Sequence, residues 1–189
     1  MAFVEGEVTE EQYLIHFGRL HRAKMTFRVV DFHGVPFSLV TRAVETKKAE
    51  EKEARRGRGR ARDEYWCVFD VDVHEKLTDA IDLAARNGIQ LAISNPCIEL
   101  WFLIHFEDQF AFIERHDAQR AAKAHTRCDK SLTTAALEAL EERFPAAKDR
   151  ARALESKHVG DGTPAPGNPS SDVWRIVDSI VSRQAERAR

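Results

Sequence analysis

The first ninety-odd residues alternate short apolar runs with amphipathic segments, and this alternation restricts the fold more than any other feature. Four apolar runs have the length and the β-branched and aromatic content of strands: residues 2–5, 27–32, 65–73 and 89–93. A helical pattern from Leu77 to Asn87 ends at Gly88, the residue type that most often follows a helix. Strands joined by helices form parallel sheets that helices cover on both faces. The sequence therefore predicts an α/β core with a mostly parallel, four-stranded sheet.

After Ser94 the pattern becomes helical only. Five helices are predicted, over residues 96–106, 117–125, 131–143, 146–158 and 172–187. Residues 160–171, GDGTPAPGNPSS, form a loop by composition. Because no internal repeat or linker divides the chain, we predict a single domain over residues 1–189. It combines an α/β core over residues 1–94 with an all-helical C-terminal part over residues 95–189.

A strongly charged segment precedes the third predicted strand. Residues 46–63, TKKAEEKEARRGRGRARD, contain no apolar residue larger than alanine and two glycines, so we predict a mobile arm. Its arginines alternate with small residues, a pattern that suits contact with the phosphates of a nucleic acid. A solvated loop whose arginines pair with nearby glutamates explains the pattern almost as well. The candidate nucleic-acid-binding residues are Arg55, Arg56, Arg58, Arg60 and Arg62.

Composition excludes several classes of protein. No stretch approaches the eighteen or so apolar residues of a membrane span, and the start MAFVEGEVTEE lacks the basic and apolar regions of a signal peptide. The three cysteines, Cys67, Cys97 and Cys128, are an odd number at unrelated spacings, which indicates reduced core thiols. We therefore predict a cytoplasmic protein with no membrane contact.

Asp70 and Asp72 lie in the third predicted strand, CVFDVDVH. Residues two apart in a strand point to the same face, so these two like charges need a positive partner. They follow four apolar residues and so lie near the carboxyl end of the strand, where α/β sheets bind ligands. Mg²⁺ or Mn²⁺ suits carboxylate oxygens. A hydrogen-bonded pair in a turn, a nucleotide-sugar site and an aspartyl-phosphate site remain alternatives.

The end of the first predicted strand adds a third carboxylate. Glu5 ends that strand and precedes Gly6, which permits a sharp turn or a close approach to a ligand. Thr9, with Gln12 three positions later, has the capping-box pattern of a helix start. In that first turn, an interaction with the helix dipole explains Glu10 better than a place beside a metal site does.

The segment SNPCIELWFLIHF, residues 94–106, contains one acidic residue in an otherwise apolar helix. Asn95 is a suitable N-cap and Pro96 a suitable first residue, which makes Glu99 the fourth helical position and leaves it unexplained by capping. We predict that Glu99 is buried and needs a partner, such as a metal, an arginine or backbone amides. His105 is more typical of a hydrogen-bonded core histidine than of a catalytic group. A zinc site from His116, His125 and Cys128 fits no common spacing.

Four segments together resemble the RloB family: EGEVTE, FDVDVH, SNPCIELWFLIHF and GNPSSDVWRIVDSI. These proteins have a Toprim-like domain and are encoded near restriction and phage-defence systems. The resemblance implies a Toprim-like fold in which Glu5, Asp70 and Asp72 hold Mg²⁺ for phosphodiester chemistry. It assigns Asn95 and Glu99 to the family's own motif. Glu10, Asn95 and His105 are candidates for residues that support the metal ligands.

The leading hypothesis is a Mg²⁺-dependent nuclease that cuts RNA, such as transfer RNA, or DNA during phage defence. Its catalytic residues would be Glu5, Asp70, Asp72 and Glu99. The alternative is a non-catalytic module that binds nucleic acid or a partner ATPase and holds a structural ion. A nucleotide-sugar transferase is disfavoured because it leaves Glu5 and Glu99 unexplained. By resemblance alone, a homodimer is a further expectation.

Overall fold

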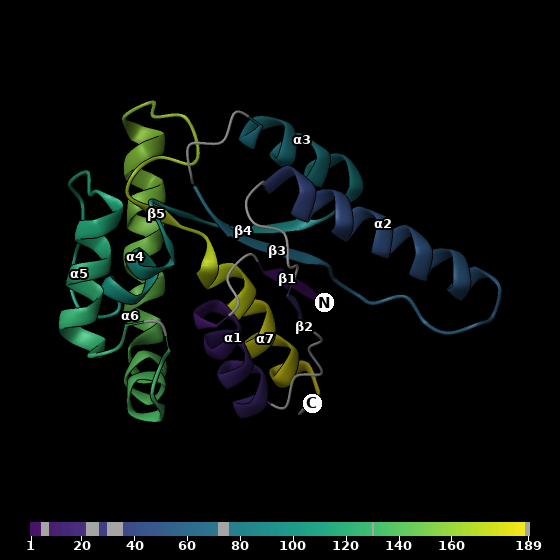
Figure 1. The fold of residues 1–189 in the computed structure, drawn as a ribbon, viewed down its shortest axis with the longest axis horizontal. Coiled ribbons are helices and arrows are strands. Elements are labelled where there is room, and N and C mark those ends of the chain that lie inside the picture. The colour runs from purple at the N-terminus through teal and green to yellow at the C-terminus, as the bar shows by residue number, and fades with distance from the viewer. Residues whose placement is uncertain (5–7, 22–26, 30–35, 72–75, 130, 188–189) are drawn as a thin grey trace.

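The computed structural model describes residues 1–4, 8–21, 27–29, 36–71, 76–129 and 131–187. A central sheet lies between helices on its two faces, and three further helices gather at one end of it (Figure 1). The α/β class, the flanking helices and the helical C-terminal part are as predicted. No helix in the described part of the chain is both long enough and apolar enough to cross a membrane.

The sequence predicted a mostly parallel sheet, but the sheet is mixed. In the described part of the chain its strand order is β2-β1-β3-β4-β5. The first four run parallel, whereas β5 pairs antiparallel with the end of β4. The composition of the 160–171 loop concealed β5, because two serines have no strand pattern of their own. The strands are β1 (Ala2–Val4), β2 (Phe27–Val29), β3 (Trp66–Asp70), β4 (Gln90–Asn95) and β5 (Ser170–Ser171).

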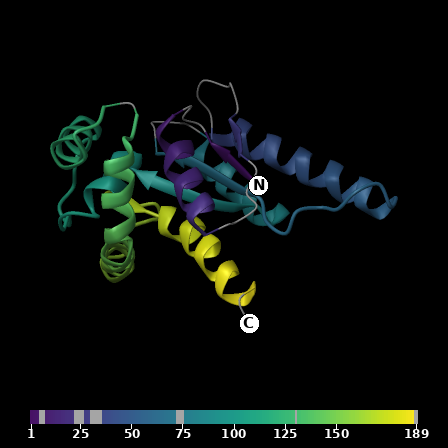
Figure 2. The same ribbon diagram turned by 90° about the horizontal axis from the view of Figure 1, so that it is seen from below.

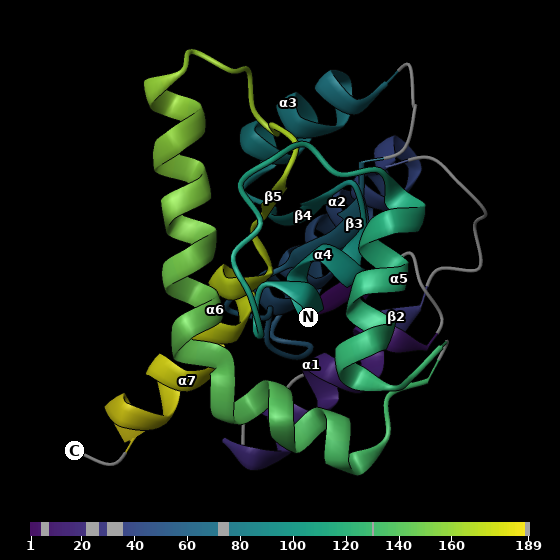
Figure 3. The ribbon, with the colours of Figure 1, turned by 90° about the vertical axis from the view of Figure 1, so that its left-hand side faces the viewer.

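Seven helices are described, and three of them differ from the prediction. They are α1 (Thr9–Leu20), α2 (Pro36–Arg55), α3 (Leu77–Asn87), α4 (Ile98–Leu103), α5 (Arg115–Thr126), α6 (Thr134–Gly160) and α7 (Val173–Arg187). α3 is confirmed, with Gly88 in the left-handed conformation at φ 61° after it. α4 is shorter than predicted. α6 is one helix where two were predicted, because it continues through Pro145 and changes direction along its length (Figure 3).

The predicted mobile arm is helical in its first half. α2 continues to Arg55, so residues 46–55 belong to a helix rather than to a loop. These residues are mainly Ala, Glu, Lys and Arg, which have high helix propensity and need no buried core to form a helix. An exposed ion pair between Glu53 and Arg56, the residue directly after α2, also supports the end of the helix.

Alternating strand residues build two hydrophobic cores on opposite faces of the sheet. Phe3, Cys67 and Phe69 pack with residues of α2 and α3. Val4 and Val68 pack instead with α1 and with the helices that follow β4. Figure 2, from below, shows α1 and α7 on this second face. Because both faces are covered, the ends of the strands are the places where polar side chains can gather.

Candidate functional site

Only part of the predicted carboxylate triad lies in the described structure. Asp70 is the last residue of β3, whereas Glu5 and Asp72 lie outside the described residues. β1 and β3 are parallel, and their register pairs Val4 with Val68. The last described residue of β1 therefore lies opposite a residue two positions before Asp70, at the carboxyl end of both strands.

Asp70 forms an ion pair that the sequence analysis missed. Arg115 Nη1 lies 3.3 Å from Asp70 Oδ2, and the two side chains are 33% and 15% exposed. Arg115 also donates from Nη2 to the carbonyl oxygen of Pro96 at 3.2 Å. It is the first residue of α5, and the Asp70 partner lies 45 residues earlier in the chain. Nothing in the local sequence distinguishes Arg115 from the other surface arginines, so no signal could have identified it.

Glu99 lies closer to the start of its helix than predicted. α4 begins at Ile98 after Cys97 as N-cap, so Glu99 is the second helical residue rather than the fourth. Its side chain is half-buried rather than buried. The cause is the position of Asn95, which ends β4 and is not the N-cap. A carboxylate in the first turn of a helix is favourable to the helix dipole.

The thiol of Cys97 shows that three charged groups gather at this end of the sheet. Cys97 is fully buried, and burial is the main cause that raises the pKa of its thiol, followed by the negative charge of Glu99. The charge of Asp70 raises this pKa further, whereas that of Arg115 lowers it. Asp70, Glu99 and Arg115 therefore all act on one buried group. A thiol with a raised pKa stays protonated at neutral pH, so Cys97 is no nucleophile here.

Asn95 and Asn168 join the end of β4 to the loop before β5. Asn95 Nδ2 donates to the carbonyl oxygen of Pro166 at 2.9 Å, and Asn95 Oδ1 accepts from Asn168 Nδ2 at 3.4 Å. Asn168 also holds the segment before α5, because it accepts from the Ile113 N–H and donates to the Ile113 carbonyl, each at 3.0 Å. Asn95 thus fixes the backbone of the loop before β5 against the end of β4. The sequence motif GNPSS contributes Asn168 to these hydrogen bonds.

His105 is a core histidine. Its Nδ1 lies 2.7 Å from the carbonyl oxygen of Trp101, which can only accept, so Nδ1 carries the proton. Its Nε2, 3.3 Å from Tyr13 Oη, then accepts from that hydroxyl. Burial lowers the pKa of His105 to about 3. The neutral imidazole therefore links α4 to α1.

Glu10 lies in the first turn of α1, as predicted from the sequence, but the helix begins after Val8 without a side-chain cap.

Gln12 stabilises a different contact from the predicted capping box. Its Oε1 accepts from the Leu132 backbone N–H at 2.7 Å, and its Nε2 donates to Ser131 Oγ at 3.1 Å. α1 is thereby attached to the segment that leads into α6. The capping-box interpretation is wrong, because a tertiary partner takes the amide that local capping would have used.

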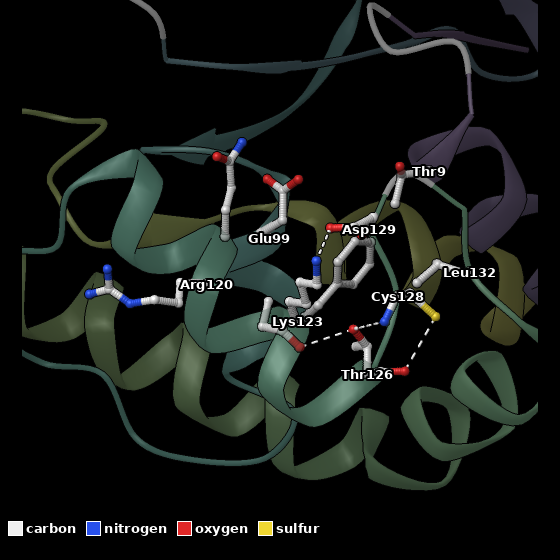
Figure 4. Close-up of a pocket in the computed structure, with 11 residues that line it drawn as sticks. Thr9, Glu99, Arg120, Lys123, Thr126, Cys128, Asp129 and Leu132 are labelled. Carbon is white, nitrogen blue, oxygen red and sulfur yellow. Dashed lines mark hydrogen bonds and ion pairs between the residues drawn. The ribbon is translucent and has the colours of Figure 1, made fainter.

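A pocket of about 330 Å³ lies between α4, α5 and the start of α1 (Figure 4). Glu99 lines it from α4, and Lys123 lines it from α5 beside its ion-pair partner Asp129. Cys128 also lines it, with its thiol donating to the Thr126 carbonyl at 3.2 Å. Other residues that line the pocket include Thr9, Gln119 and Arg120. The half-buried carboxylate of Glu99 therefore borders a pocket that both charged and apolar side chains line.

The RloB-like protein family model matches residues 1–180, which extends from β1 into α7. The chain belongs to the RloB-like family. No curated protein and no solved structure gives a significant match. The resemblance inferred from the four sequence segments is thus confirmed for the family. The match includes both the sheet and the helical part, so it covers every residue of the candidate site in this RloB-like chain.

The described carboxylates of this RloB-like chain suit a hard divalent cation in their chemistry. Asp70 and Glu99 are oxygen donors that act on the same Cys97 thiol, and Mg²⁺ prefers oxygen donors. Among the described residues, no group of three histidine, cysteine, aspartate or glutamate side chains is placed to hold a metal ion. His116 and His125 bind Gln119 and Glu107 instead, which gives no support to a zinc site. A magnesium site would thus need the two further carboxylates of the sequence motif, Glu5 and Asp72.

The basic segment lies at the other end of β3 from Asp70. It precedes Trp66, the first residue of β3, and Figure 1 shows it at the outer end of α2. Arg62 pairs with Glu50 at 2.9 Å, and Arg56 with Glu53 at 3.0 Å. These arginines therefore do not lie beside the carboxylates, as a clamp on the reacting phosphate would require.

Proposed function

We propose that this RloB-like protein is a Mg²⁺-dependent nuclease of the Toprim type that cuts RNA or DNA in phage defence. One observation carries the proposal. Asp70 ends a strand that is parallel to and in register with β1, and Glu99 and Arg115 share its surroundings. In α/β sheets this edge is where ligands bind. Membership of the RloB-like family supports the same conclusion.

Glu5, Asp70 and Asp72 would hold the metal, with Mn²⁺ as a substitute for Mg²⁺. When bound, the ion would polarise the scissile phosphate and lower the pKa of an attacking water. Arg115 would place a guanidinium beside the negative charge that develops on the scissile phosphate, because its planar donors match phosphate oxygens. Glu99, open to the pocket, would orient the water or accept its proton.

The ion pair of Asp70 with Arg115 favours a second candidate function. A carboxylate that is already neutralised by an arginine does not require a metal, and such a pair can be purely structural. In this case the chain would bind nucleic acid without cutting it, and any ion would be structural. The two functions differ in whether phosphodiester bonds are broken.

A cleavage assay separates them. Purified protein is incubated with end-labelled RNA, transfer RNA and DNA, with Mg²⁺, Mn²⁺ or EDTA. We expect metal-dependent cleavage that is lost in the Asp70→Asn, Asp72→Asn double variant and kept in Asp79→Asn, which changes an exposed carboxylate on α3. Cleavage that persists in the double variant contradicts the nuclease. Retarded mobility of the nucleic acid without cleavage by wild type supports the binding module.

A further inference from the structure

We propose that the outer end of α2 and the turn after it form a second contact to the phosphate backbone, distant from the site at Asp70. We call residues 55–60 the basic tip. This inference rests on the proposed nuclease and names its substrate class: a nucleic acid long enough to reach both places at once. A mononucleotide or dinucleotide would contact only one of them.

The basic tip extends beyond the body of the molecule. The last buried residue of α2 is Val44, and Lys47 donates to the carbonyl oxygens of Asn87 and Gly88, next to the start of β4. From Lys47 to Arg55 a helix advances about 12 Å. Figures 1 and 2 agree that this half of α2 leads away from the sheet. β3 runs the opposite way from this end of the sheet, and from Trp66 to Asp70 a strand advances about 13 Å. The two lengths together place the tip and Asp70 on the order of 25 Å apart.

The turn is anchored rather than loosely attached. Glu50 accepts a hydrogen bond from Tyr65 Oη at 2.6 Å and pairs with Arg62 at 2.9 Å, which fastens the returning chain to α2. Gly57 and Gly59 have positive φ values of 73° and 121°, which other residues adopt only with strain. The chain therefore has a built turn that holds its arginines outward at a defined place.

The charge of this region suits a polyanion. Residues 46–63 contain eight basic and four acidic residues, a net charge of +4, in a chain whose net charge is −2. The ion pairs at the tip are exposed: Arg60 is 89% and Asp63 59% exposed. Such pairs are weak in water, so phosphates can replace their acidic partners. Arg55 and Arg58 are also exposed.

A substrate that reaches both places needs a minimum length. One strand of a duplex has a phosphate about every 3.4 Å, so roughly 25 Å corresponds to about seven nucleotides. We therefore expect binding to strengthen once the nucleic acid exceeds this length. Each phosphate contact that the tip makes also releases a counterion, which makes the added affinity depend on salt.

The experiment measures binding by fluorescence anisotropy in EDTA, so that cleavage does not interfere. The variant replaces Arg55, Arg58 and Arg60 with serine. The control replaces Arg19, Arg86 and Arg152 with serine, which removes the same charge from exposed positions elsewhere. Hairpin duplexes with stems of about five and about twenty base pairs, below and above the required length, are titrated over a range of salt.

We expect the tip variant to bind the long duplex at least about tenfold more weakly, with a salt slope shallower by about 2 to 3, as three lost phosphate contacts imply. The short duplex and the control variant should show little change. An unchanged slope, or an equal loss for both lengths, overturns the inference. Failure of this inference can be distinguished from failure of the proposed function. If the wild-type protein cuts nucleic acid but the tip variant keeps the wild-type salt slope, only the inference about the tip is refuted. A protein that binds through the tip without cutting refutes only the nuclease.

Discussion

Arg115 and Asp70, 45 residues apart in the chain, form an ion pair at 3.3 Å at the carboxyl end of β3. The pair connects the edge of the sheet to the start of α5. Because Asp70 is largely buried, its charge depends on this guanidinium or on another cation. A change at the Asp70 carboxylate is thus expected to alter both the stability of the protein and the proposed metal binding.

Replacing Arg115 with methionine should lower the free energy of unfolding by about 1–2 kcal/mol, between the values typical of exposed and buried pairs. Urea denaturation measures the change. In an Asp70→Asn background the loss should shrink, because the partner charge is absent, and a coupling energy near zero in this double-mutant cycle would contradict the pair. Under the proposed function Mg²⁺ would compete with the guanidinium for this carboxylate, so Mg²⁺ should then stabilise Arg115→Met more than wild type.

The buried His105 predicts a loss of stability in acid. Its pKa in the folded protein is about 3, against about 6.5 when unfolded, so between these pH values only the unfolded chain binds the proton. The contribution of His105 to the free energy of unfolding is therefore complete above about pH 6.5. It is lost as the pH falls toward 3, by up to about 1.4 kcal/mol per pH unit.

Denaturation at several pH values checks this prediction. In His105→Phe, the plot of unfolding free energy against pH should be shallower than in wild type between pH 3 and 6.5. His116→Phe, at an exposed position, should leave the slope unchanged and serves as the control. Equal slopes for wild type and His105→Phe would show that His105 is protonated in the folded state.

Gly167 predicts a steric effect close to β5. A Cβ atom at this position would lie 2.7 Å from Nδ1 of His158, whose Nε2 donates to the Pro169 carbonyl at 2.9 Å. Because His158 is buried and its ring is held, Gly167→Ala should destabilise the protein by about 1–3 kcal/mol.

Gly160→Ala is the matched control, since a Cβ atom there meets nothing within 4 Å at the end of α6. It should be neutral or slightly stabilising, because alanine has the higher helix propensity. Thermal unfolding of the two variants side by side measures both effects. Equal melting temperatures would mean that the chain around His158 can move aside without cost.

Local patterns predicted those parts of the fold that depend on near neighbours in the chain. α3 and its terminal Gly88 agree with the prediction because helical periodicity and a left-handed end are local properties. The prediction was wrong where a distant partner competed with a local one. Gln12 binds the Leu132 backbone instead of capping α1, and Asn95 binds the β5 loop instead of capping α4.

The sequence by itself determined the alternation of strands and helices, the place of Asp70 at the end of an apolar strand and the membership of a family. Only the tertiary structure decided that Arg115 neutralises Asp70, that Glu99 opens to a pocket and that the basic tip lies at the opposite end of β3. The physical reason is that periodicity and propensity act over a few residues, whereas charge pairing and strand register join residues that the chain keeps far apart.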